Sequence, residues 1–358
     1  MTATRAKPPR KPTTSGQTKL SDVATLAGVS VATVSRVINA PHTVREPLRK
    51  RVEEALSALD YIPDPAARAL ASKRMNTIGI VVPALGTAIF ADWMVALQHR
   101  LDQHGLAMLT ASSEYDPDKE HRAIVSLLNR GVDGVVLVGN DHLPVTYKLL
   151  RQRGVPAICA YTDATEAGLP GVGFDHREAM RELARYMVRI GHREIGVITS
   201  PLRHNDRVSA RLQGIRDALA QVRCELPVAR VLEVPYSAAE GRKAFARLMD
   251  RHPALTAVMC TTDILAFGAL LEATRLGYRI PEDVSITGFD DLELAEHMLP
   301  PLTTVRSPSQ AIGTACADAI MKLILQQPCV PPAITTELVI RGSSGKPRER
   351  GDRPRKGR

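Results

Sequence analysis

The sequence predicts a two-part fold, in which a small all-α helix-turn-helix headpiece precedes a larger α/β body with two sheet lobes. Two short helical patterns joined by a glycine turn lie within residues 20–39. From Thr77 onward, apolar runs rich in β-branched residues alternate with amphipathic stretches. That alternation is typical of buried parallel strands connected by helices. Roughly 260 residues of such units are too many for one mononucleotide-sized sheet, so we expect two sheets.

The segment LSDVATLAGVSVATVSRVIN (20–39) predicts the helix-turn-helix. Ser21 and Ser30 are suited to cap the two helices, and Gly28 supplies a turn conformation that other residues resist. Apolar residues at helical spacing predict the buried face, namely Val23, Ala24, Leu26, Ala27, Val34, Val37 and Ile38. The second helix begins with small outward residues, which suits insertion into a DNA major groove. An ordinary three-helix bundle without a partner is the alternative.

A third amphipathic helix completes the headpiece, which we place at residues 19–74. Its apolar residues are Leu48, Val52, Ala55, Leu56 and Leu59. Residues 1–18 precede it as a disordered basic arm, since they are rich in Pro, Thr, Lys and Arg and have no apolar period. Residues 1–74 hold 13 basic and 6 acidic side chains, a net charge of +7. This concentration of positive charge indicates a polyanionic partner, with solvated basic tails as the alternative.

The body (75–341) contains seven expected strands and six expected helices. The strands are TIGIVV (77–82), LAMLT (106–110), GVVLV (134–138), VPAICA (155–160), EIGVIT (194–199), AVMC (257–260) and VSIT (284–287). Helical patterns lie between the strands, for example near 91–103, 118–130, 177–190, 209–222, 239–251 and 263–276. The last stretch, 342–358, is polar, basic and broken by Gly and Pro, so we expect a disordered tail.

Composition excludes several classes of protein. The five cysteines are scattered without a CxxC pair, so a disulfide framework and a zinc site are not expected, and a reducing cytoplasm fits. No apolar run approaches the roughly 20 residues of a membrane helix, and no apolar segment follows the basic N-terminus. The sequence has no GxGxxG, GxSxG, HExxH or Walker motif. We therefore expect neither an enzyme nor a cofactor or metal.

Ordered blocks along the chain carry a resemblance to a known family. The segment DVATLAGVSVATVSRVIN (22–39) resembles the DNA-binding headpiece of the lactose/galactose repressor (LacI/GalR) family. The resemblance covers about residues 20–340 and recurs in RGVDGVVLV (130–138), VGFDH (172–176), GHREIGVIT (191–199), CTTDILAFGAL (260–270), IPEDVSITGFDD (280–291) and PPLTTV (300–305). It implies that the body is a two-lobed effector domain of the type I periplasmic-binding-protein-like fold.

The resemblance also implies roles in DNA binding. Val31, Ala32 and Arg36 match base-reading positions, and only Arg36 has the donors to bridge guanine O6 and N7. Thr33 and Ser35 suit phosphate contacts, which position the protein without specifying sequence. The segment PDPAARALA (63–71) resembles the family's hinge helix, expected at 64–72. Its Leu70 matches the leucine that wedges into a minor-groove step, with a plain buried leucine as the alternative.

A cleft between the lobes is implied as the effector site. Arg211 and Asp290 match the effector-binding arginine and its acidic partner, and we expect them to hold the ligand across the two lobes. The alternative is that they pair with each other. Phe90 and Tyr236 match aromatic walls, with plain core packing as the alternative.

This chain departs from the family at three positions of the implied site. Tyr161 stands where Asp is frequent, Thr262 where Asn is frequent, and Arg207 where a small polar residue is frequent. Losing an acid and gaining an arginine favours an anionic effector such as a sugar acid, unless Arg207 is solvated or paired with Asp206. His192, in the family's Gly-His turn, is expected to be structural.

We therefore expect a homodimeric transcriptional regulator, most simply a repressor, in the cytoplasm and on the nucleoid. Its partners would be a palindromic operator whose half-sites meet at a central CG step and a small-molecule effector, with a sugar or a sugar acid such as gluconate favoured. The alternative is a periplasmic-binding-protein-like sensor that does not bind DNA.

Overall fold

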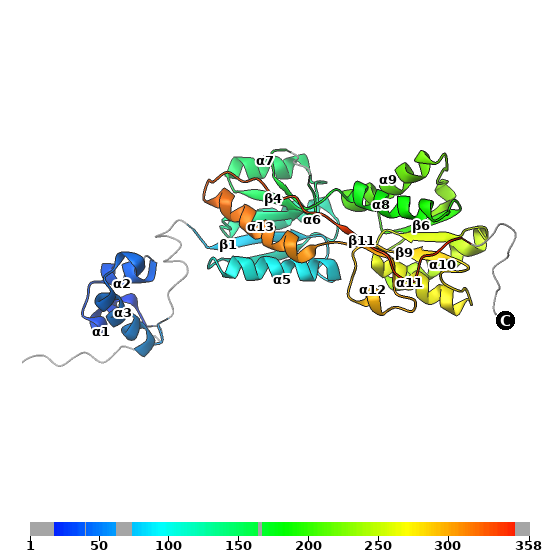
Figure 1. The fold of residues 1–358 in the computed structure, drawn as a ribbon. Coiled ribbons are helices and arrows are strands. Elements are labelled where there is room, and N and C mark those ends of the chain that lie inside the picture. Colours follow the sequence, from blue (N-terminus) through cyan, green and yellow to red (C-terminus); the bar gives the residue numbers. More distant parts are fainter. Residues whose placement is uncertain (1–17, 40, 62–73, 164–166, 348–358) are drawn as a thin grey trace, which may run out of the picture. The chain divides into compact units, whose positions relative to one another are not determined.

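The chain divides into two compact units, Met1–Met75 and Asn76–Arg358. The computed structural model describes residues 18–39, 41–61, 74–163 and 167–347 (Figure 1). Almost all of the expected N-terminal arm, the expected hinge helix 64–72 with Leu70, and residues 348–358 of the expected tail lie outside the described residues.

The first unit is a three-helix headpiece. Its elements are α1 (Leu20–Ala27), α2 (Val31–Asn39), the 3₁₀ turn η1 (Pro41–Thr43) and α3 (Glu46–Ala58). Val23, Val34 and Val52, one from each α-helix, are fully buried and form the centre of its core. No single described helix is long and apolar enough to cross a membrane, and only the bent pair α1 and α2 together reaches that length and composition.

Two details of the first helix differ from expectation. The helix begins at Leu20 rather than after Ser21, and the Asp22 carboxylate accepts a hydrogen bond from the Lys19 amide at 2.9 Å. Leu26 is 55% exposed instead of buried. At 3.6 residues per turn, a residue two places after Ala24 lies on nearly the opposite side of the helix, and Ala24 faces the core.

The first lobe of the body is a five-stranded parallel sheet in the order β2-β1-β3-β4-β5. Its strands are β1 (Thr77–Val82), β2 (Ala107–Ser112), β3 (Gly134–Val138), β4 (Ala157–Ala160) and β5 (Gly171–Val172). Its helices are α5 (Ala88–Asp102), α6 (Pro117–Asn129), α7 (Pro144–Arg153) and α13 (Ser309–Ile324). Helices α5 and α13 pack together on one face, and α6 and α7 cover the other (Figure 1). Strand β3 is therefore buried along its whole length.

The second lobe repeats this architecture with a four-stranded parallel sheet in the order β7-β6-β8-β9. Its strands are β6 (Ile195–Thr199), β7 (Val231–Glu233), β8 (Ala257–Cys260) and β9 (Ser285–Thr287). Its helices are α8 (His176–Arg189), α9 (Asp206–Gln221), α10 (Ala238–Arg251), α11 (Asp263–Arg275) and the short α12 (Leu294–His297), with a 3₁₀ turn η2 (Val228–Arg230). Pairs α8–α9 and α10–α11 sandwich the sheet.

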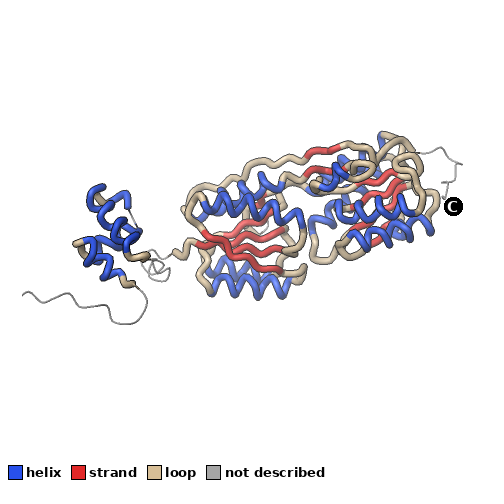
Figure 2. The backbone as a smooth tube through the Cα atoms, turned by 90° about the horizontal axis from the view of Figure 1, so that it is seen from below, coloured by secondary structure: helices blue, strands red, loops and turns tan. Residues whose placement is uncertain are grey.

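The chain passes between the lobes three times: after β5, after β10 (Thr304–Arg306) and before β11 (Glu337–Val339). Strands β10 and β11 pair antiparallel with each other. Figure 2 shows the two lobes of the body, each with its strands (red) between helices (blue). The carboxyl ends of β4, β6 and β8 lead directly to Tyr161, Ser200 and Thr262, which line one cavity. Such ends are where open α/β sheets bind ligands.

The expectation of disorder is wrong for residues 342–347, which are described and packed on the second lobe. Ser343 is completely buried, and its hydroxyl donates to the Ile286 carbonyl at 2.6 Å. The Gly345 carbonyl accepts from His192 Nε2 at 2.9 Å. The sequence did not predict this packing because hydrogen bonds to backbone and hydroxyl groups hold the segment. Such bonds leave no apolar period in the sequence.

Candidate DNA-binding face and effector cavity

The second headpiece helix presents the three expected base-reading side chains to solvent. Val31 is 46% exposed, and Ala32 and Arg36 are also exposed, whereas Thr33 and Ser35 are half-buried. Within the described part of the chain, Arg36 makes no hydrogen bond or ion pair. Its guanidinium donors are therefore available to a partner.

The turn that orients this helix is held by two local devices. Ser30 Oγ accepts from the Thr33 amide at 3.2 Å and so caps α2, as expected. Gly28 has φ of 62°, a conformation that favours glycine. Arg51 of α3 donates through Nη2 to the Ala27 carbonyl at 2.5 Å. The third helix thus fixes the end of the first helix where the turn begins.

The structure brings all seven expected effector residues to one cavity between the lobes. It is lined by Thr87, Ile89, Phe90, Tyr115, Tyr161, Ser200, Asn205, Arg207, Val208, Arg211, Tyr236, Thr262 and Asp290. The first lobe contributes Phe90 and Tyr161, and the second contributes the other five expected residues. A wider hollow of about 770 Å³ adjoins this cavity and shares four lining residues with it, namely Tyr115, Ser200, Asn205 and Tyr236.

Arg211 is the centre of the buried polar groups. Its three nitrogens donate to His176 Nδ1 at 3.2 Å, to the Thr261 carbonyl at 2.7 Å and to Asp290 Oδ1 at 3.2 Å. Its guanidinium also lies over the Phe289 ring, 3.7 Å from the ring centre. Arg211 and Asp290 therefore pair with each other, and both belong to the second lobe. Their pairing is the alternative stated for them above.

His176 is a neutral acceptor for Arg211. Its Nε2 faces the Tyr161 carbonyl at 3.1 Å, so that nitrogen carries the proton and Nδ1 accepts from Arg211. Burial, with the charges of Arg211 and Arg207 adding to it, holds the pKa of His176 well below its usual value. A neutral imidazole thus fixes the plane of the arginine fork.

Asp290 combines backbone strain with a shifted pKa. Its φ is 124°, in the region that favours glycine. Burial raises the pKa of Asp290 to about 6, although the neighbouring Arg211 lowers it. The carboxylate accepts a hydrogen bond from Arg211 Nη2 and is its acidic partner.

Arg207 is buried and joined to its neighbour. Its Nη1 donates to Asp206 Oδ1 at 3.0 Å and to the Val138 carbonyl of the first lobe at 3.1 Å. The pairing with Asp206 that we left open therefore exists. Among the described residues, Nε and Nη2 of Arg207 have no hydrogen-bond acceptor, so these donors are available to a ligand.

Two further cavity side chains have buried oxygens without a partner. Neither the Tyr236 hydroxyl nor Thr262 Oγ1 bonds to a described residue. Tyr161, in contrast, donates its hydroxyl to the Ile89 carbonyl at 3.0 Å and packs edge-on against Phe90. Buried polar atoms are normally hydrogen-bonded. Tyr236 and Thr262 are thus suited to ligand hydroxyls, while Tyr161 and Phe90 form a wall.

Several cavity residues did not follow from the sequence. Thr87, Tyr115, Ser200 and Asn205 line the cavity, and His176 supports Arg211. His176 ends the block VGFDH and Phe289 lies in IPEDVSITGFDD, so both lie in segments that carry the resemblance. The other four lie in loops without a distinctive pattern.

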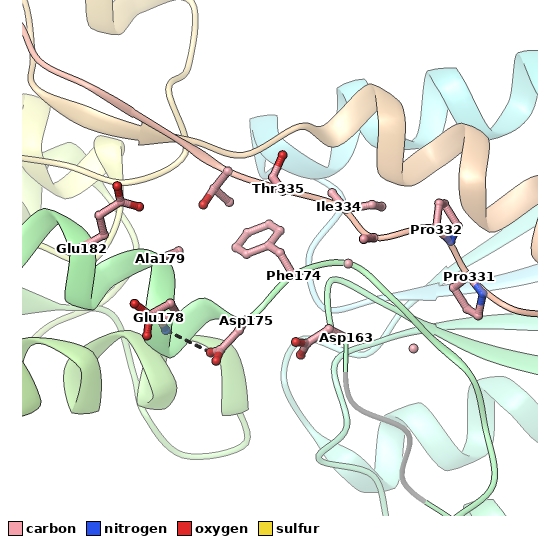
Figure 3. Close-up of a pocket in the computed structure, with 14 residues that line it drawn as sticks. Asp163, Phe174, Asp175, Glu178, Ala179, Glu182, Pro331, Pro332, Ile334 and Thr335 are labelled. Carbon is pink, nitrogen blue, oxygen red and sulfur yellow. Dashed lines mark hydrogen bonds between the residues drawn. The ribbon is translucent and has the colours of Figure 1, made fainter.

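A second hollow lies on the crossing segments, away from the cavity. Its volume is about 560 Å³, and Figure 3 shows Asp163, Asp175, Glu178 and Glu182 around the extended segment that follows Pro332 and leads to β11. Asp175 accepts from the Glu178 amide as the cap of α8, and Glu178 pairs with Arg185. None of the expected site residues lies here. No group of His, Cys, Asp or Glu among the described residues could hold a metal ion.

Comparison with known proteins covers both parts of the chain. Residues 19–64 match the family described as bacterial regulatory proteins, lacI family, and residues 75–341 match periplasmic binding proteins and sugar binding domain of LacI family. The regulator GntR of Pseudomonas aeruginosa is 32% identical over 87% of this chain and 90% of its own. The repressor CytR of Escherichia coli is 31% identical over 91% and 96%.

A solved structure gives the same result. The Lac repressor dimer, bound to operator and the anti-inducer ONPF, matches with a TM-score of 0.81 and 27% identity, over 92% of this chain and 99% of its own. The expected two-part fold is thereby confirmed. The chain belongs to the lacI family of bacterial regulatory proteins, as a DNA-binding transcriptional repressor with a sugar-binding domain, and is not an enzyme.

Proposed function

We propose that the protein represses transcription as a homodimer on a palindromic operator and that a small molecule in the inter-lobe cavity switches its operator affinity. The observation that carries this proposal is the meeting of all seven expected effector residues at one cavity in a chain that also presents an exposed recognition helix. The Lac repressor, a structural relative, is a dimer on its operator.

On DNA, we propose that Arg36 reads a guanine, that Val31 and Ala32 make methyl contacts, and that Thr33 and Ser35 contact phosphates. The exposure of Arg36 and its lack of partners among the described residues support this reading. We propose, with the hinge helix outside the described residues, that Leu70 wedges into a central CG step. The phosphate contacts give affinity and the arginine gives sequence preference.

We propose that the effector is a sugar or a sugar acid, with gluconate favoured. The Tyr236 and Thr262 hydroxyl groups suit the hydroxyls of a polyol, and the unused donors of Arg207 suit an acid group.

Operator binding tests the DNA part of this proposal. In fluorescence anisotropy with the protein's own promoter, Arg36→Ala should lose preference for operator over scrambled DNA, by about 1–3 kcal/mol, and keep its binding to scrambled DNA. Wild-type protein without any preference would favour the alternative, a sensor that does not bind DNA.

Thermal stability tests the effector part. Gluconate at 100 times its dissociation constant should stabilise the body by about 2.7 kcal/mol. Glucose, the neutral sugar of the same size, should give less. Equal increases in stability with gluconate and glucose would show that the protein does not recognise the acid group.

A further inference from the structure

The start of α9 grips a turn of the first lobe through two neighbouring residues. Asp206 Oδ2 accepts a hydrogen bond from the Asn140 amide at 2.8 Å. Arg207 Nη1 donates to the Val138 carbonyl at 3.1 Å, and the same nitrogen bonds Asp206 Oδ1. One ion pair of the second lobe thus holds an amide and a carbonyl of the first. We call the contact of Asp206 and Arg207 with residues 138–140 the clamp.

Gly139, at the centre of the gripped turn, is required for this approach. A Cβ atom at Gly139 would lie 2.1 Å from Arg207 Nη1 and 2.4 Å from Asp206 Oδ1. Its φ of 81° also favours glycine. The position therefore tolerates no side chain while the clamp is closed.

The gripped turn is held in shape from within the first lobe. The Gly139 carbonyl meets His142 Nε2 at 2.9 Å, and His142 Nδ1 meets Glu120 Oε1 at 2.7 Å. The Asn140 carbonyl accepts from the Tyr147 hydroxyl at 2.6 Å. These contacts within the first lobe orient the Asn140 amide and the Val138 carbonyl for their bonds to the second lobe.

The closed clamp leaves little space in the cavity. Its volume is about 30 Å³, far below the roughly 300–1,000 Å³ of ordinary ligand sites. Arg207 is both a cavity wall and half of the clamp. A ligand of sugar size therefore needs the lobes to part or Arg207 to move, and either change breaks the contact with Val138.

We propose that the clamp is a ligand-competing lock, in which Arg207 exchanges the Val138 carbonyl of the first lobe for the acid group of the effector. The inference rests on the proposed effector site. In this proposal, Gly139 and Asp206 set the fraction of protein molecules in which the clamp is open and a ligand can bind. When a binding-competent state is only partly populated, the apparent affinity falls by that fraction. Weakening the clamp should therefore tighten effector binding.

Gly139→Ala and Gly168→Ala form a matched pair for the test. Both glycines have φ of 81°, but a Cβ atom at Gly168 would meet nothing within 4 Å. The two variants share the backbone penalty, and only Gly139→Ala collides with the clamp. Asp206→Ala removes the same contact from the side of the second lobe. It replaces Gly139→Ala in the test if that variant folds poorly.

The first measurement is hydrogen exchange of the Asn140 amide in the full-length, ligand-free protein. This amide should be protected in wild type and in Gly168→Ala, and should exchange at least about tenfold faster in Gly139→Ala and Asp206→Ala. If the Asn140 amide exchanges as slowly in both Gly139→Ala and Asp206→Ala as in wild type, the proposal of a clamp is wrong.

The second measurement is titration with gluconate. Gly139→Ala should bind it about fivefold or more tightly than wild type and Gly168→Ala, and gluconate should speed the exchange of the wild-type Asn140 amide. Weaker binding by Gly139→Ala, or slower amide exchange, would overturn the competition. If no variant binds gluconate, the proposed effector is wrong, and the ligand-free measurement still decides the clamp.

Discussion

At the residue scale, backbone strain gathers around the effector cavity and its mouth. Glu114, Tyr115, Tyr161, His204 and Asp290 all have positive φ without being glycine, and each lines the cavity or the adjoining hollow. Such conformations cost about 1–3 kcal/mol each and persist where the surrounding structure imposes them. Their concentration here indicates that the loops after the strands are shaped for ligand contact rather than for stability.

The sequence identified seven of the residues that line the cavity but not most of the partners that hold them. Arg211 and Asp290 followed from the resemblance, whereas the His176 contact joins residues 35 positions apart through the fold. The exposed Leu26 shows the same limit, because an apolar residue at near-helical spacing can face either side of a short helix. Side-chain pairing depends on tertiary distances, which a one-dimensional pattern does not contain.

Arg51→Met should loosen the headpiece. The substitution keeps the apolar stem and removes the bond to the Ala27 carbonyl, and hydrogen bonds from charged groups contribute about 1.5–3 kcal/mol. Amides of α2 should exchange at least about tenfold faster, while those of the body are unchanged. Arg49→Met, which loses only an exposed pair with Glu53, is the control. Equal exchange in both variants would contradict a role for Arg51 in fixing the turn.

At the element scale, the sequence predicted most of the long elements but did not identify helices α7 and α13 or four of the short strands. The seven strands and six helices named above for the body all exist. Most of them bury an apolar run or an apolar stripe, whereas the edge strand β2 is largely exposed. Strands β5, β7, β10 and β11 have only two or three residues, too few for any period to show. The ordered segment 342–347 was not predicted for a related reason, since hydrogen bonds rather than apolar contacts hold it.

Truncation separates the two halves of the C-terminal segment. Deleting 348–358 should leave the unfolding free energy unchanged and make the salt dependence of non-specific DNA binding shallower, since that stretch has six basic and two acidic residues. Deleting 342–358 should also destabilise the body by about 2–5 kcal/mol, because the partners of Ser343 and Gly345 lose their hydrogen bonds. Urea unfolding of the two truncated proteins measures this difference. Equal unfolding free energies would contradict the packing of residues 342–347 on the second lobe.

The His192 contact with this segment should depend on pH. Burial lowers the pKa of His192 to about 4, and its Nε2 proton is held by the Gly345 carbonyl. The folded state thus prefers neutral His192, so its contribution is complete above the unfolded pKa near 6.5. It is lost as pH falls toward 4, by roughly 3 kcal/mol in all.

His192→Gln should therefore flatten the fall in unfolding free energy between pH 7 and pH 4.5. His297→Gln, at a largely exposed position of α12, should not. Urea titrations at the two pH values measure the difference. A wild-type slope in His192→Gln would show that another group carries the acid sensitivity.

At the scale of the whole molecule, the two lobes act on one cavity from opposite sides. The first lobe provides an aromatic wall from Phe90 and Tyr161, and the second provides the charged pair of Arg211 and Asp290. A ligand that binds one arrangement of the lobes better than the other shifts the population between them. Coupling of this kind typically amounts to about 1–3 kcal/mol, or 5–150-fold in affinity.

The most direct test of such a switch is operator affinity with and without gluconate, measured by anisotropy on wild type and Arg211→Lys. Lysine keeps the buried charge that Asp290 requires and loses the planar fork. Wild type should change its operator affinity by 5–150-fold on adding gluconate. Arg211→Lys should bind operator as wild type does without gluconate and show no change with it. A response in Arg211→Lys with wild-type midpoint and amplitude would contradict the assignment of the cavity as the effector site.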